Sequence, residues 1–226
     1  MQGKVVLITG ANGGLGTDVT QAFLSEGATV VGTSRSIRQT DFSGQNFTAI
    51  PADITQPAAA RELIAKIVER FKHIDVLVHV MGGFAAGKIH DTDDETWKRM
   101  QDLNVNSGFY IAREVVRAMR ATGGGRIIAI GSLAATEPHA GIGAYVVSKT
   151  ALTVLFRTIA LENADAGITS NIVLPDTMDT PANRAAMPKA DPSKWVKPAD
   201  VAKIVLTLAG DAGAQINGAV IPVFGS

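Results

Sequence analysis

The sequence predicts an α/β fold: one doubly wound, mainly parallel sheet of seven strands with helices on both faces. Two observations lead to this prediction. Short runs rich in valine and isoleucine alternate with longer amphipathic stretches along all 226 residues, as in domains built from repeated strand and helix units. Several short runs are apolar at successive positions, which is typical of strands covered on both faces. No linker or low-complexity tract interrupts the alternation, so we expect one domain over residues 1–226.

The seven expected strands are short and bounded by residues that favour turns. In chain order they are Lys4–Thr9, Thr29–Thr33, Phe47–Pro51, Asp75–Val80, Arg126–Ile130, Ser170–Leu174 and Ala219–Val223.

Between these runs the apolar residues recur at helical spacing. The expected helices are Leu15–Glu26, Pro57–Lys72, Glu95–Arg120, Gly143–Asp165 and Pro198–Ala209. Pro57, Pro181 and Pro198 stand where helices start, because proline suits the first helical turn, and Gly27 is placed to cap the first helix. The segment from Pro175 to Lys197 has four prolines and mixed polarity. We expect it to form a mobile loop at the carboxyl end of a strand.

Composition excludes several functional classes. The chain has 21 basic and 21 acidic residues, so it lacks the positive charge typical of nucleic-acid binders. Its lack of cysteine excludes disulfides, thiolate nucleophiles and zinc-thiolate sites, and its four scattered histidines predict no metal site. No segment approaches the roughly twenty apolar residues of a membrane span, and no charged leader precedes an apolar stretch at the N-terminus. We therefore expect a cytoplasmic protein whose partner is a small molecule.

A glycine-rich turn follows the first expected strand. It reads Thr9-Gly10-Ala11-Asn12-Gly13-Gly14-Leu15-Gly16 and leads into the first expected helix. Glycines permit a tight turn there and let main-chain amides approach a pyrophosphate, while the helix N-terminus supplies a partial positive charge. Elsewhere such a turn is often only a connection, but directly after the first strand of a βα series it favours dinucleotide binding.

The end of the second strand bears on the choice of dinucleotide. A carboxylate there would bind the ribose hydroxyls of NAD, whereas this chain has Ser34 and Arg35, which suit the 2′-phosphate of NADP. NADP is preferred and NAD remains possible, since Arg35 is equally explained as a solvated side chain. Asp53, after the third strand, is placed to accept a hydrogen bond from the adenine amino group, to cap the helix at Pro57, or to do both.

Tyr145 and Lys149 lie four residues apart and therefore on one face of an expected helix. A nearby ammonium stabilises a phenolate and lowers the pKa of a tyrosine, which makes it a better proton donor and acceptor near neutral pH. Ser132, thirteen residues before the tyrosine, follows the fifth strand, where its hydroxyl can orient a substrate oxygen or merely cap a turn. Together with the glycine-rich turn, this set indicates a nicotinamide-dependent oxidoreductase.

In order and spacing these motifs resemble the short-chain dehydrogenase/reductase family over essentially the whole chain. The resemblance includes the glycine-rich turn, Asp53, Asn104 seven residues after Trp97, Ser132 and Tyr145-x-x-x-Lys149. It implies a Rossmann-type fold with Tyr145 as general acid/base and Ser132 positioning the reacting oxygen. It further implies that Lys149 binds the nicotinamide ribose and lowers the tyrosine pKa, and that Asn104 holds a water in a proton relay.

The same resemblance implies an extended set of cofactor contacts. The main chain of Met178 and the hydroxyl of Thr180 would meet the nicotinamide carboxamide. The complete expected set is Gly10, Asn12, Gly13, Gly14, Leu15, Gly16, Ser34, Arg35, Asp53, Ile54, Val80, Met81, Gly82, Tyr145, Lys149, Pro175, Met178 and Thr180.

The chain also departs from the family pattern. Where Asn-Asn-Ala-Gly is common after the fourth strand, this chain has His79-Val80-Met81-Gly82, and His79 is expected to be structural. Asp176 stands where glycine usually follows Pro175, which questions the local backbone shape. Phe84, Met178, Met187 and Trp195 form either an apolar wall over the nicotinamide or part of the core.

A narrower resemblance, to dihydropteridine reductase, concerns the loop from Leu174 to Trp195 together with Gly82–Gly87 and Trp97. Against it, that enzyme carries an acid after its second strand and lacks the catalytic serine, whereas this chain has Ser34-Arg35 and Ser132.

Three functions therefore stay open. The first is hydride transfer between nicotinamide and a carbonyl or alcohol carbon, the second is reduction of a quinonoid pteridine, and the third is a dinucleotide-binding sensor or scaffold without turnover. Binding alone would require neither Ser132 nor Tyr145, which disfavours the third. The family resemblance also implies a homodimer or homotetramer formed through the two longest helices. The substrate and the direction of the reaction do not follow from the sequence.

Overall fold

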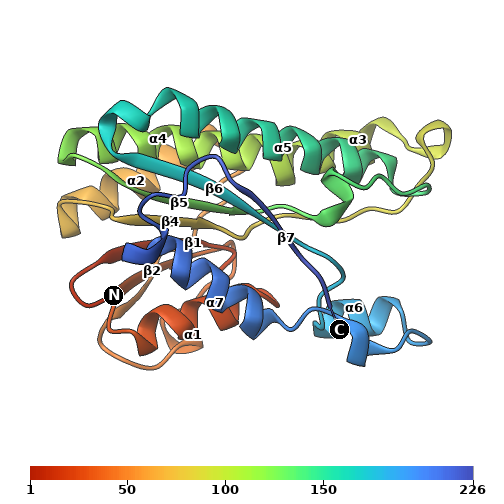
Figure 1. Cartoon of the computed structure of the whole chain (residues 1–226), viewed down its shortest axis with the longest axis horizontal. Helices are drawn as coiled ribbons and strands as arrows, with labels where there is room; N and C mark the ends of the chain where they lie inside the picture. The colour runs from red at the N-terminus through yellow and green to blue at the C-terminus, as the bar shows by residue number, and fades with distance from the viewer. Residues whose placement is uncertain (226) are drawn as a thin grey trace.

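Seven strands form one sheet in the computed structural model, which describes residues 1–225 (Figure 1). They are β1 (Val5–Thr9), β2 (Thr29–Thr33), β3 (Phe47–Ala49), β4 (Val76–His79), β5 (Gly125–Ile130), β6 (Ile168–Pro175) and β7 (Val220–Val223). Their order is β3-β2-β1-β4-β5-β6-β7, and every neighbouring pair is parallel. The predicted Rossmann-type α/β fold is confirmed, and every expected strand is present to within a few residues.

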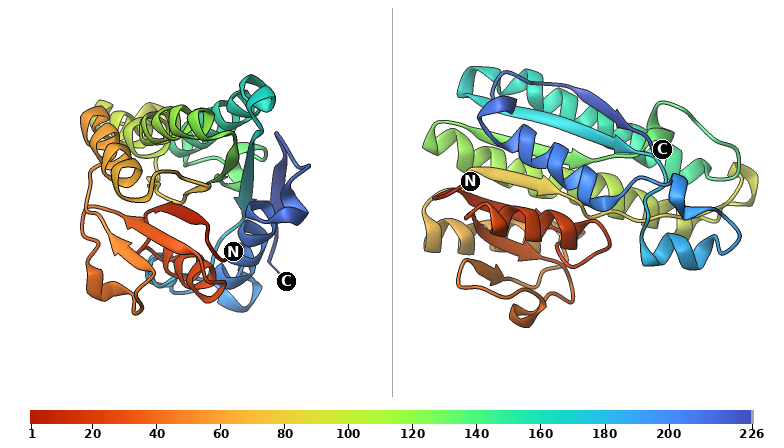
Figure 2. Two further views of the ribbon diagram at one scale, coloured as in Figure 1. Left: turned by 90° about the vertical axis from the view of Figure 1, so that its left-hand side faces the viewer. Right: turned by 60° about the horizontal axis from the view of Figure 1, so that its bottom comes forward.

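Helices cover both faces of this sheet, as Figure 2 shows in its left-hand view. One face carries α2 (Pro57–Phe71), α4 (Ser107–Thr122) and α5 (Gly143–Glu162), and the other carries α1 (Gly16–Ser25) and α7 (Pro198–Ala209). Two shorter helices, α3 (Asp94–Met100) and α6 (Pro181–Ala186), lie beyond the carboxyl ends of the strands. Gly27 closes α1 with a left-handed backbone (φ +76°), as its position predicts.

Two apolar layers, one on each side of the sheet, form the core. Along β1 the side chains of Val5 and Leu7 join one layer, whereas Val6 and Ile8 join the other. All five β1 residues are buried, which explains why this strand is apolar at successive positions instead of alternating. Phe156 of α5 is among the largest buried side chains of the first layer, and Phe23 of α1 of the second.

By length and composition alone, α5 is apolar enough to cross a membrane. Core helices of globular proteins satisfy the same criterion, and α5 contributes Leu152 and Phe156 to the apolar layer that it shares with α2 and α4.

The long helix expected from Glu95 to Arg120 is interrupted, and this expectation is corrected. A π-helical turn at Gln101–Asn106 separates α3 from α4, and the Ser107 N–H bonds to the Asp102 carbonyl five residues back. No glycine or proline marks this turn in the sequence, so the local pattern gave no signal. Asn104 lies within this π-helical turn and is fully buried. Such π-turns are frequent at functional sites.

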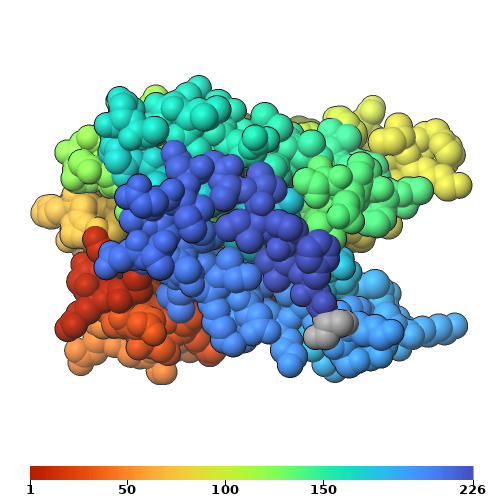
Figure 3. All heavy atoms as spheres, viewed as in Figure 1, coloured from red at the N-terminus to blue at the C-terminus, as the bar shows by residue number. Residues whose placement is uncertain are grey.

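The segment from Pro175 to Lys197 is more ordered than a plain loop. It contains α6, which begins at the expected Pro181, and a short 3-10 turn at Pro192–Lys194. Val196 pairs back onto its start, because Val196 N–H donates to Thr177 O (2.9 Å) and Asp179 N–H donates to Val196 O (2.8 Å). In the space-filling view the α6 region projects at the lower right, separated by a notch from the yellow segment after β4 (Figure 3).

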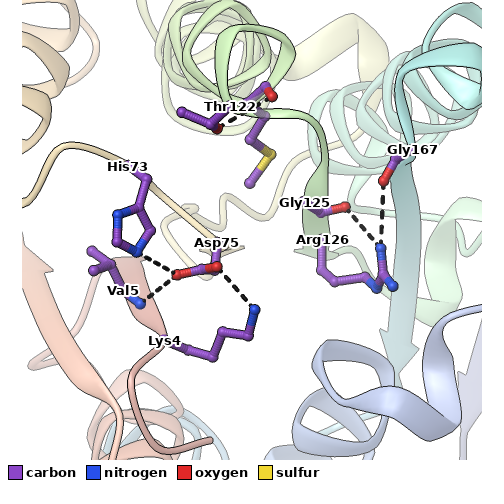
Figure 4. A network of polar contacts seen from close by, with 9 residues as sticks. Lys4, Val5, His73, Asp75, Thr122, Gly125, Arg126 and Gly167 are labelled. Atoms are coloured by element: carbon purple, nitrogen blue, oxygen red, sulfur yellow. Dashed lines mark hydrogen bonds and ion pairs between the residues drawn. The ribbon is translucent and has the colours of Figure 1, made fainter.

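Two groups of polar contacts lie at the amino ends of the strands, one between β1 and β4 and the other between β5 and β6 (Figure 4). The Asp75 carboxylate, just before β4, accepts hydrogen bonds from Val5 N–H (2.8 Å) and Lys4 Nζ (3.0 Å) and pairs with His73 Nε2 (3.1 Å). Beside it, the Arg126 guanidinium donates to the carbonyls of Gly125 (3.3 Å) and Gly167 (3.5 Å). The charged groups of Lys4, Asp75 and Arg126 thus each have a polar partner.

Candidate active site

A cleft of about 740 Å³ opens at the carboxyl ends of β1 and β4. These strands are neighbours, but the chain continues from β1 to β2 on one side and from β4 to β5 on the other. Ligands bind at such a switch point because the diverging connections leave a crevice. All the expected cofactor residues line this cleft except Asp53 and Pro175. The fold thus brings most of the expected residues together, and it adds others that were not expected as cofactor contacts, including Gly83, Gly131 and Asn183.

The glycine-rich turn forms one wall of the cleft without projecting side chains. Gly10 has a left-handed backbone (φ +66°), and a Cβ on Gly16 would lie only 1.9 Å from the Gly10 carbonyl oxygen. A Cβ on Gly14 would lie 3.0 Å from the Thr180 methyl group, so the opposite wall comes close at this point. Helix α1 begins at Gly16 with its N-terminus toward the cleft. This bare cradle fits the pyrophosphate of a dinucleotide.

A second hollow of about 660 Å³ lies beside the end of β2 and shares Asn12 and Arg35 with the main cleft. Here Asp41 joins two segments, because its carboxylate accepts hydrogen bonds from Asn12 Nδ2 (3.0 Å) and from Arg38 N–H (3.1 Å). Arg38 also lines this hollow with its exposed guanidinium. Sequence reasoning did not identify Asp41. The only feature of the sequence that pointed to Asp41 was its position three residues after Arg38, the spacing of a capping contact.

Asp53 and Pro175 lie outside the lining of the cleft. The Asp53 carboxylate accepts hydrogen bonds from the Thr55 N–H (3.1 Å) and hydroxyl (2.6 Å), which stabilise the turn before α2. The N-cap of α2 is Gln56, so the suggestion that Asp53 caps this helix was wrong. Its contact with adenine stays a prediction. Pro175 is the buried last residue of β6.

Tyr145 and Lys149 lie one turn apart on α5, and Ser132 follows β5. The Ser132 hydroxyl accepts a hydrogen bond from Ala134 N–H (3.3 Å), so it does cap a turn, and it lies close enough to the phenol of Tyr145 to influence its pKa. Burial raises the pKa of Tyr145, and the neighbouring Ser132 partly lowers it again. The two oxygens expected to meet one substrate atom are therefore neighbours.

The Lys149 ammonium is almost completely buried, with 5% of the residue exposed. Its Nζ donates to the Ile130 carbonyl (3.1 Å), and burial lowers its pKa to about 8. The sequence led us to expect that Lys149 lowers the pKa of Tyr145. In this structure burial dominates instead, and the pKa of Tyr145 lies above its ordinary value.

Asn104 lies behind the cleft and ties three segments together. Its amide Nδ2 donates to Gly83 O (3.0 Å) and to the Ser148 hydroxyl (2.9 Å), while Oδ1 accepts from Gly83 N–H (2.8 Å). The Ser148 hydroxyl in turn donates to the main-chain carbonyl of Tyr145 (2.8 Å). These bonds connect the turn after β4 to the helix that carries Tyr145. Sequence reasoning missed Ser148, although its position between Tyr145 and Lys149 pointed to it.

His79 is fully buried at the end of β4, next to Lys149. The Thr9 hydroxyl accepts hydrogen bonds from Val80 N–H and Met81 N–H (both 3.2 Å), so its proton points to His79 Nδ1 at 3.0 Å. Nδ1 is then the acceptor and Nε2 carries the ring proton, yet Nε2 has no hydrogen-bond partner. Burial and the charge of Lys149 lower the pKa of His79 to about 3, which keeps the ring neutral. The expected structural role fits this arrangement.

The far end of the cleft is apolar. Phe84, Leu103 and Met178 line it, and the ring of Phe84 meets that of Tyr145 edge to face with centroids 5.0 Å apart. Met187 and Trp195, suggested for the same wall, are absent from the lining among the residues described.

Asp176 does not distort the backbone after β6. Within residues 1–225 the one non-glycine residue with a positive φ is Lys72, so the position of Asp176 imposes no need for glycine. Its carboxylate accepts a hydrogen bond from Thr177 N–H (2.7 Å). Farther along, the Met178 carbonyl accepts from Thr180 N–H (2.9 Å) and Asn183 Nδ2 (2.8 Å), which fixes the start of α6 against the cleft.

Comparisons with known proteins agree with this geometry. A family model described as short chain dehydrogenase matches residues 4–191. The 3-oxoacyl-[acyl-carrier-protein] reductase FabG of Escherichia coli is 30% identical over 99% of this chain and 97% of its own. A 3beta-hydroxysteroid dehydrogenase of Mediterraneibacter gnavus is 30% identical over 96% and 92% of the two chains. The solved structure "ElxO with NADP Bound" has a TM-score of 0.93 at 27% identity and covers 99% of this chain and 97% of that one.

Proposed function

Because the chain belongs to the short-chain dehydrogenase/reductase family and is an NAD(P)-dependent oxidoreductase, we propose that Tyr145 is its general acid/base. The reaction transfers a hydride between nicotinamide and a carbonyl or alcohol carbon. When bound, the reduced dinucleotide supplies that hydride. Tyr145 moves the proton at the substrate oxygen, and Ser132 holds that oxygen beside the phenol. Lys149 holds the nicotinamide ribose.

The observation that carries this proposal is that three groups come together at one edge of the cleft, where Tyr145 and Lys149 line it and Ser132 directly follows the lining residue Gly131. The phenol of Tyr145, the hydroxyl of Ser132 and the buried ammonium of Lys149 come from two elements, yet they converge where β4 and β5 end. A buried ammonium beside the cleft stabilises negative charge that develops on the phenol during proton transfer. Asn104 supports this arrangement through Gly83 and Ser148, and the proposed relay water would bind next to it.

We propose NADP as the preferred cofactor and NAD as a weaker one. Arg35 and Arg38 line the hollow beside the end of β2, and Ser34 lines the main cleft next to Arg35. Guanidinium and hydroxyl groups bind a phosphate, whereas a carboxylate at the same place would repel it. The NADP named in the structure of ElxO supports the same choice.

Replacing Tyr145 tests the assignment of the acid/base. Tyr145→Phe removes only the hydroxyl, so we expect the rate of carbonyl-dependent NADPH oxidation to fall by about 10³-fold or more while NADPH affinity changes less than about threefold. Initial rates and fluorescence titration of NADPH measure the two quantities. Full activity in this variant would refute the assignment. The rates are measured with a panel of ketones, diketones and quinones. Quinonoid dihydrobiopterin is added to this panel to test the pteridine alternative that the sequence of the Leu174–Trp195 loop suggested.

We further propose that two copies of the chain associate through α5. Leu152 and Phe156 of this helix belong to the core, so they are not part of the proposed interface. Val147, Val154 and Leu161 are exposed and recur every seven residues along the helix, with Leu161 82% exposed. Light scattering of the wild type and of Val154→Glu tests this dimer, and a tetramer would appear in the same measurement. A cytoplasmic location is also part of the proposal, and cell fractionation tests it.

A further inference from the structure

The substrate end of the cleft lacks charge among the residues described. Of the residues lining the cleft, Arg35 and Lys149 are the ionisable cations, and no acid lines it. Arg35 follows β2, on the opposite side of β1 from Tyr145 and the turn after β4. Lys149 is buried and bonded to Ile130 O. Neither is available to pair with an anionic group of a substrate.

The neighbouring cation on α6 is also engaged. Arg184 forms a two-pronged pair with Asp179, with Nη2 2.9 Å from the carboxylate. The polar groups at the start of α6 are similarly satisfied, because Asn183 Nδ2 bonds to Met178 O and Asn183 N–H bonds to the Thr180 hydroxyl. Tyr145 and the neighbouring Ser132 are therefore left to contact the reacting oxygen.

Phe84 is a large apolar side chain held in the cleft with 62% of its surface exposed. Its ring lies at 67° to the ring of Tyr145, and most of its surface stays open to a ligand. Leu103 and Met178 are further apolar residues that line the cleft. Apolar surface of this kind is stabilised when a flat apolar ring covers it.

The segment that carries Phe84 is fixed to the helix that carries Tyr145. Gly87 N–H donates to Gly141 O (2.7 Å), and Gly143 N–H donates to Gly87 O (3.2 Å). The side chain of Ile89 covers Gly143, where an added Cβ would lie 2.4 Å from the isoleucine Cδ1. The phenylalanine and the tyrosine are thus held by one connected framework, which favours a substrate of fixed shape.

Resting on the function proposed above, we propose that the substrate is a neutral ketone whose carbonyl is attached to a flat apolar ring. The ring packs against Phe84, Leu103 and Met178, and the carbonyl oxygen lies between Tyr145 and Ser132. A carboxylate or phosphate on the ring is excluded, because burying it here without a cation costs free energy. Carbonyl reduction adds a hydride to the carbon and a proton from Tyr145 to the oxygen, while NADPH is oxidised to NADP⁺.

A matched pair of ketones tests this substrate class. Methyl 4-acetylbenzoate and 4-acetylbenzoate differ at one position by the presence of a charge, and butanedione serves as a small ketone without a ring. We expect kcat/KM for the ester to exceed that for the acid by about tenfold or more. Calorimetric titration of both compounds into the complex with NADP⁺ should give a Kd ratio in the same direction. An acid that reacts or binds as well as the ester, or an ester that does not bind, overturns the proposal.

Two variants locate the effect. Phe84→Ala should lower kcat/KM for the ester about tenfold and for butanedione less than about threefold, because only the ester covers the ring. Phe224→Ala removes a phenylalanine of similar exposure, 60%, which is absent from the cleft lining within the described residues, and should leave both values within about twofold. Equal losses for both ketones in Phe84→Ala would contradict a ring contact. If no ketone is reduced, the proposed function fails, whereas the two Kd values still decide the substrate class.

Discussion

The two ends of the parallel sheet treat polar groups in opposite ways. At the amino ends, Asp75, Lys4 and His73 are partly exposed and satisfy one another (Figure 4). At the carboxyl ends, Lys149 is buried with a neutral carbonyl as its partner, and His79 keeps a buried nitrogen without any. Charge is screened and paired at one end, and at the other it is removed from water.

This difference shows where the fold keeps groups that lower its stability. Burying an ammonium or leaving an imidazole N–H unpaired costs free energy that surface pairs do not. The carboxyl ends are also where the connections diverge and the cleft opens. Thr169 Oγ1, near the amino end of β6, is also buried without a partner, but the buried charge of Lys149 lies at the carboxyl ends, which indicates that this charge is retained for chemistry. Removing a charge at the carboxyl ends should therefore lower activity more than stability, whereas removing a charge at the amino ends should leave activity unchanged.

The largest effect is expected at Lys149. Lys149→Met keeps the length of the side chain and removes the charge, so kcat/KM should fall by about a thousandfold. The free energy of unfolding should stay the same or rise, because a buried ammonium is replaced by an apolar group. Initial rates and urea denaturation measure both. The matched change at the other end of the sheet, Lys4→Met, should leave the rates unchanged. A large loss of stability in Lys149→Met would contradict the view that burial of this ammonium lowers stability.

The next effect concerns acid stability. The pKa of His79 is about 3 in the folded protein, below the ordinary 6.5, so the unfolded chain takes up its proton first as the pH falls. The stability that depends on a neutral His79 is complete above pH 6.5 and is lost as the pH falls toward 3. Between pH 7 and pH 4 this loss should reach about 3 kcal/mol.

Urea denaturation across this pH range measures the loss, and His79→Asn should remove most of it. His73→Asn is the control from the amino end, where the side chain is 40% exposed, and it should change the pH dependence by less than about 0.5 kcal/mol. An identical pH dependence in wild type and His79→Asn would show that this imidazole is not the source.

A smaller effect is expected at Thr9. Thr9→Val leaves the N–H groups of Val80 and Met81 and the His79 ring without their shared hydroxyl, at a cost of about 2 kcal/mol. NADPH affinity should weaken as well, because Val80 and Met81 line the cleft. Thr9→Ser keeps the hydroxyl and should retain most of the stability and affinity. Thermal unfolding and NADPH titration measure the two quantities. Equal losses in Thr9→Val and Thr9→Ser would contradict a role for the hydroxyl.

The smallest effect is expected at Asp75. Asp75→Asn removes the charge that Lys4 and His73 contact but keeps an oxygen for the Val5 N–H. Exposed pairs of this kind contribute little, so we expect a loss below about 1 kcal/mol and unchanged kinetics. A loss of activity would show that the two ends of the sheet are coupled.

The strands and most helices were predictable because each is specified by its own residues. Covered parallel strands must be apolar on both faces, so runs such as Val5 to Thr9 are visible without knowledge of their neighbours. The π-helical turn at Gln101–Asn106 was not predictable. It follows from the fit of Asn104 against Gly83, which lies twenty-one residues away along the chain, and no local residue type encodes that contact.

The site was predictable to the same degree. Glycines, Tyr145 and Lys149 are specified by spacing within one turn or one helix, and the cleft contains them all. Ser148 and Asp41 act through bonds to distant segments, so their residue types alone say little. The roles of Met187 and Trp195 were suggested by apolarity, which does not distinguish a cleft wall from any other partly covered surface.

The close approach of Thr180 to Gly14 bears on the order of events in a catalytic cycle. The methyl group of Thr180 lies on one side of the cleft and the glycine-rich turn on the other, so we expect a dinucleotide that enters between them to displace the start of α6. A ketone beside Phe84 need not. The kinetic consequence is a compulsory order in which the dinucleotide enters first and leaves last, with its departure limiting steady-state turnover. Product-inhibition patterns would display that order directly.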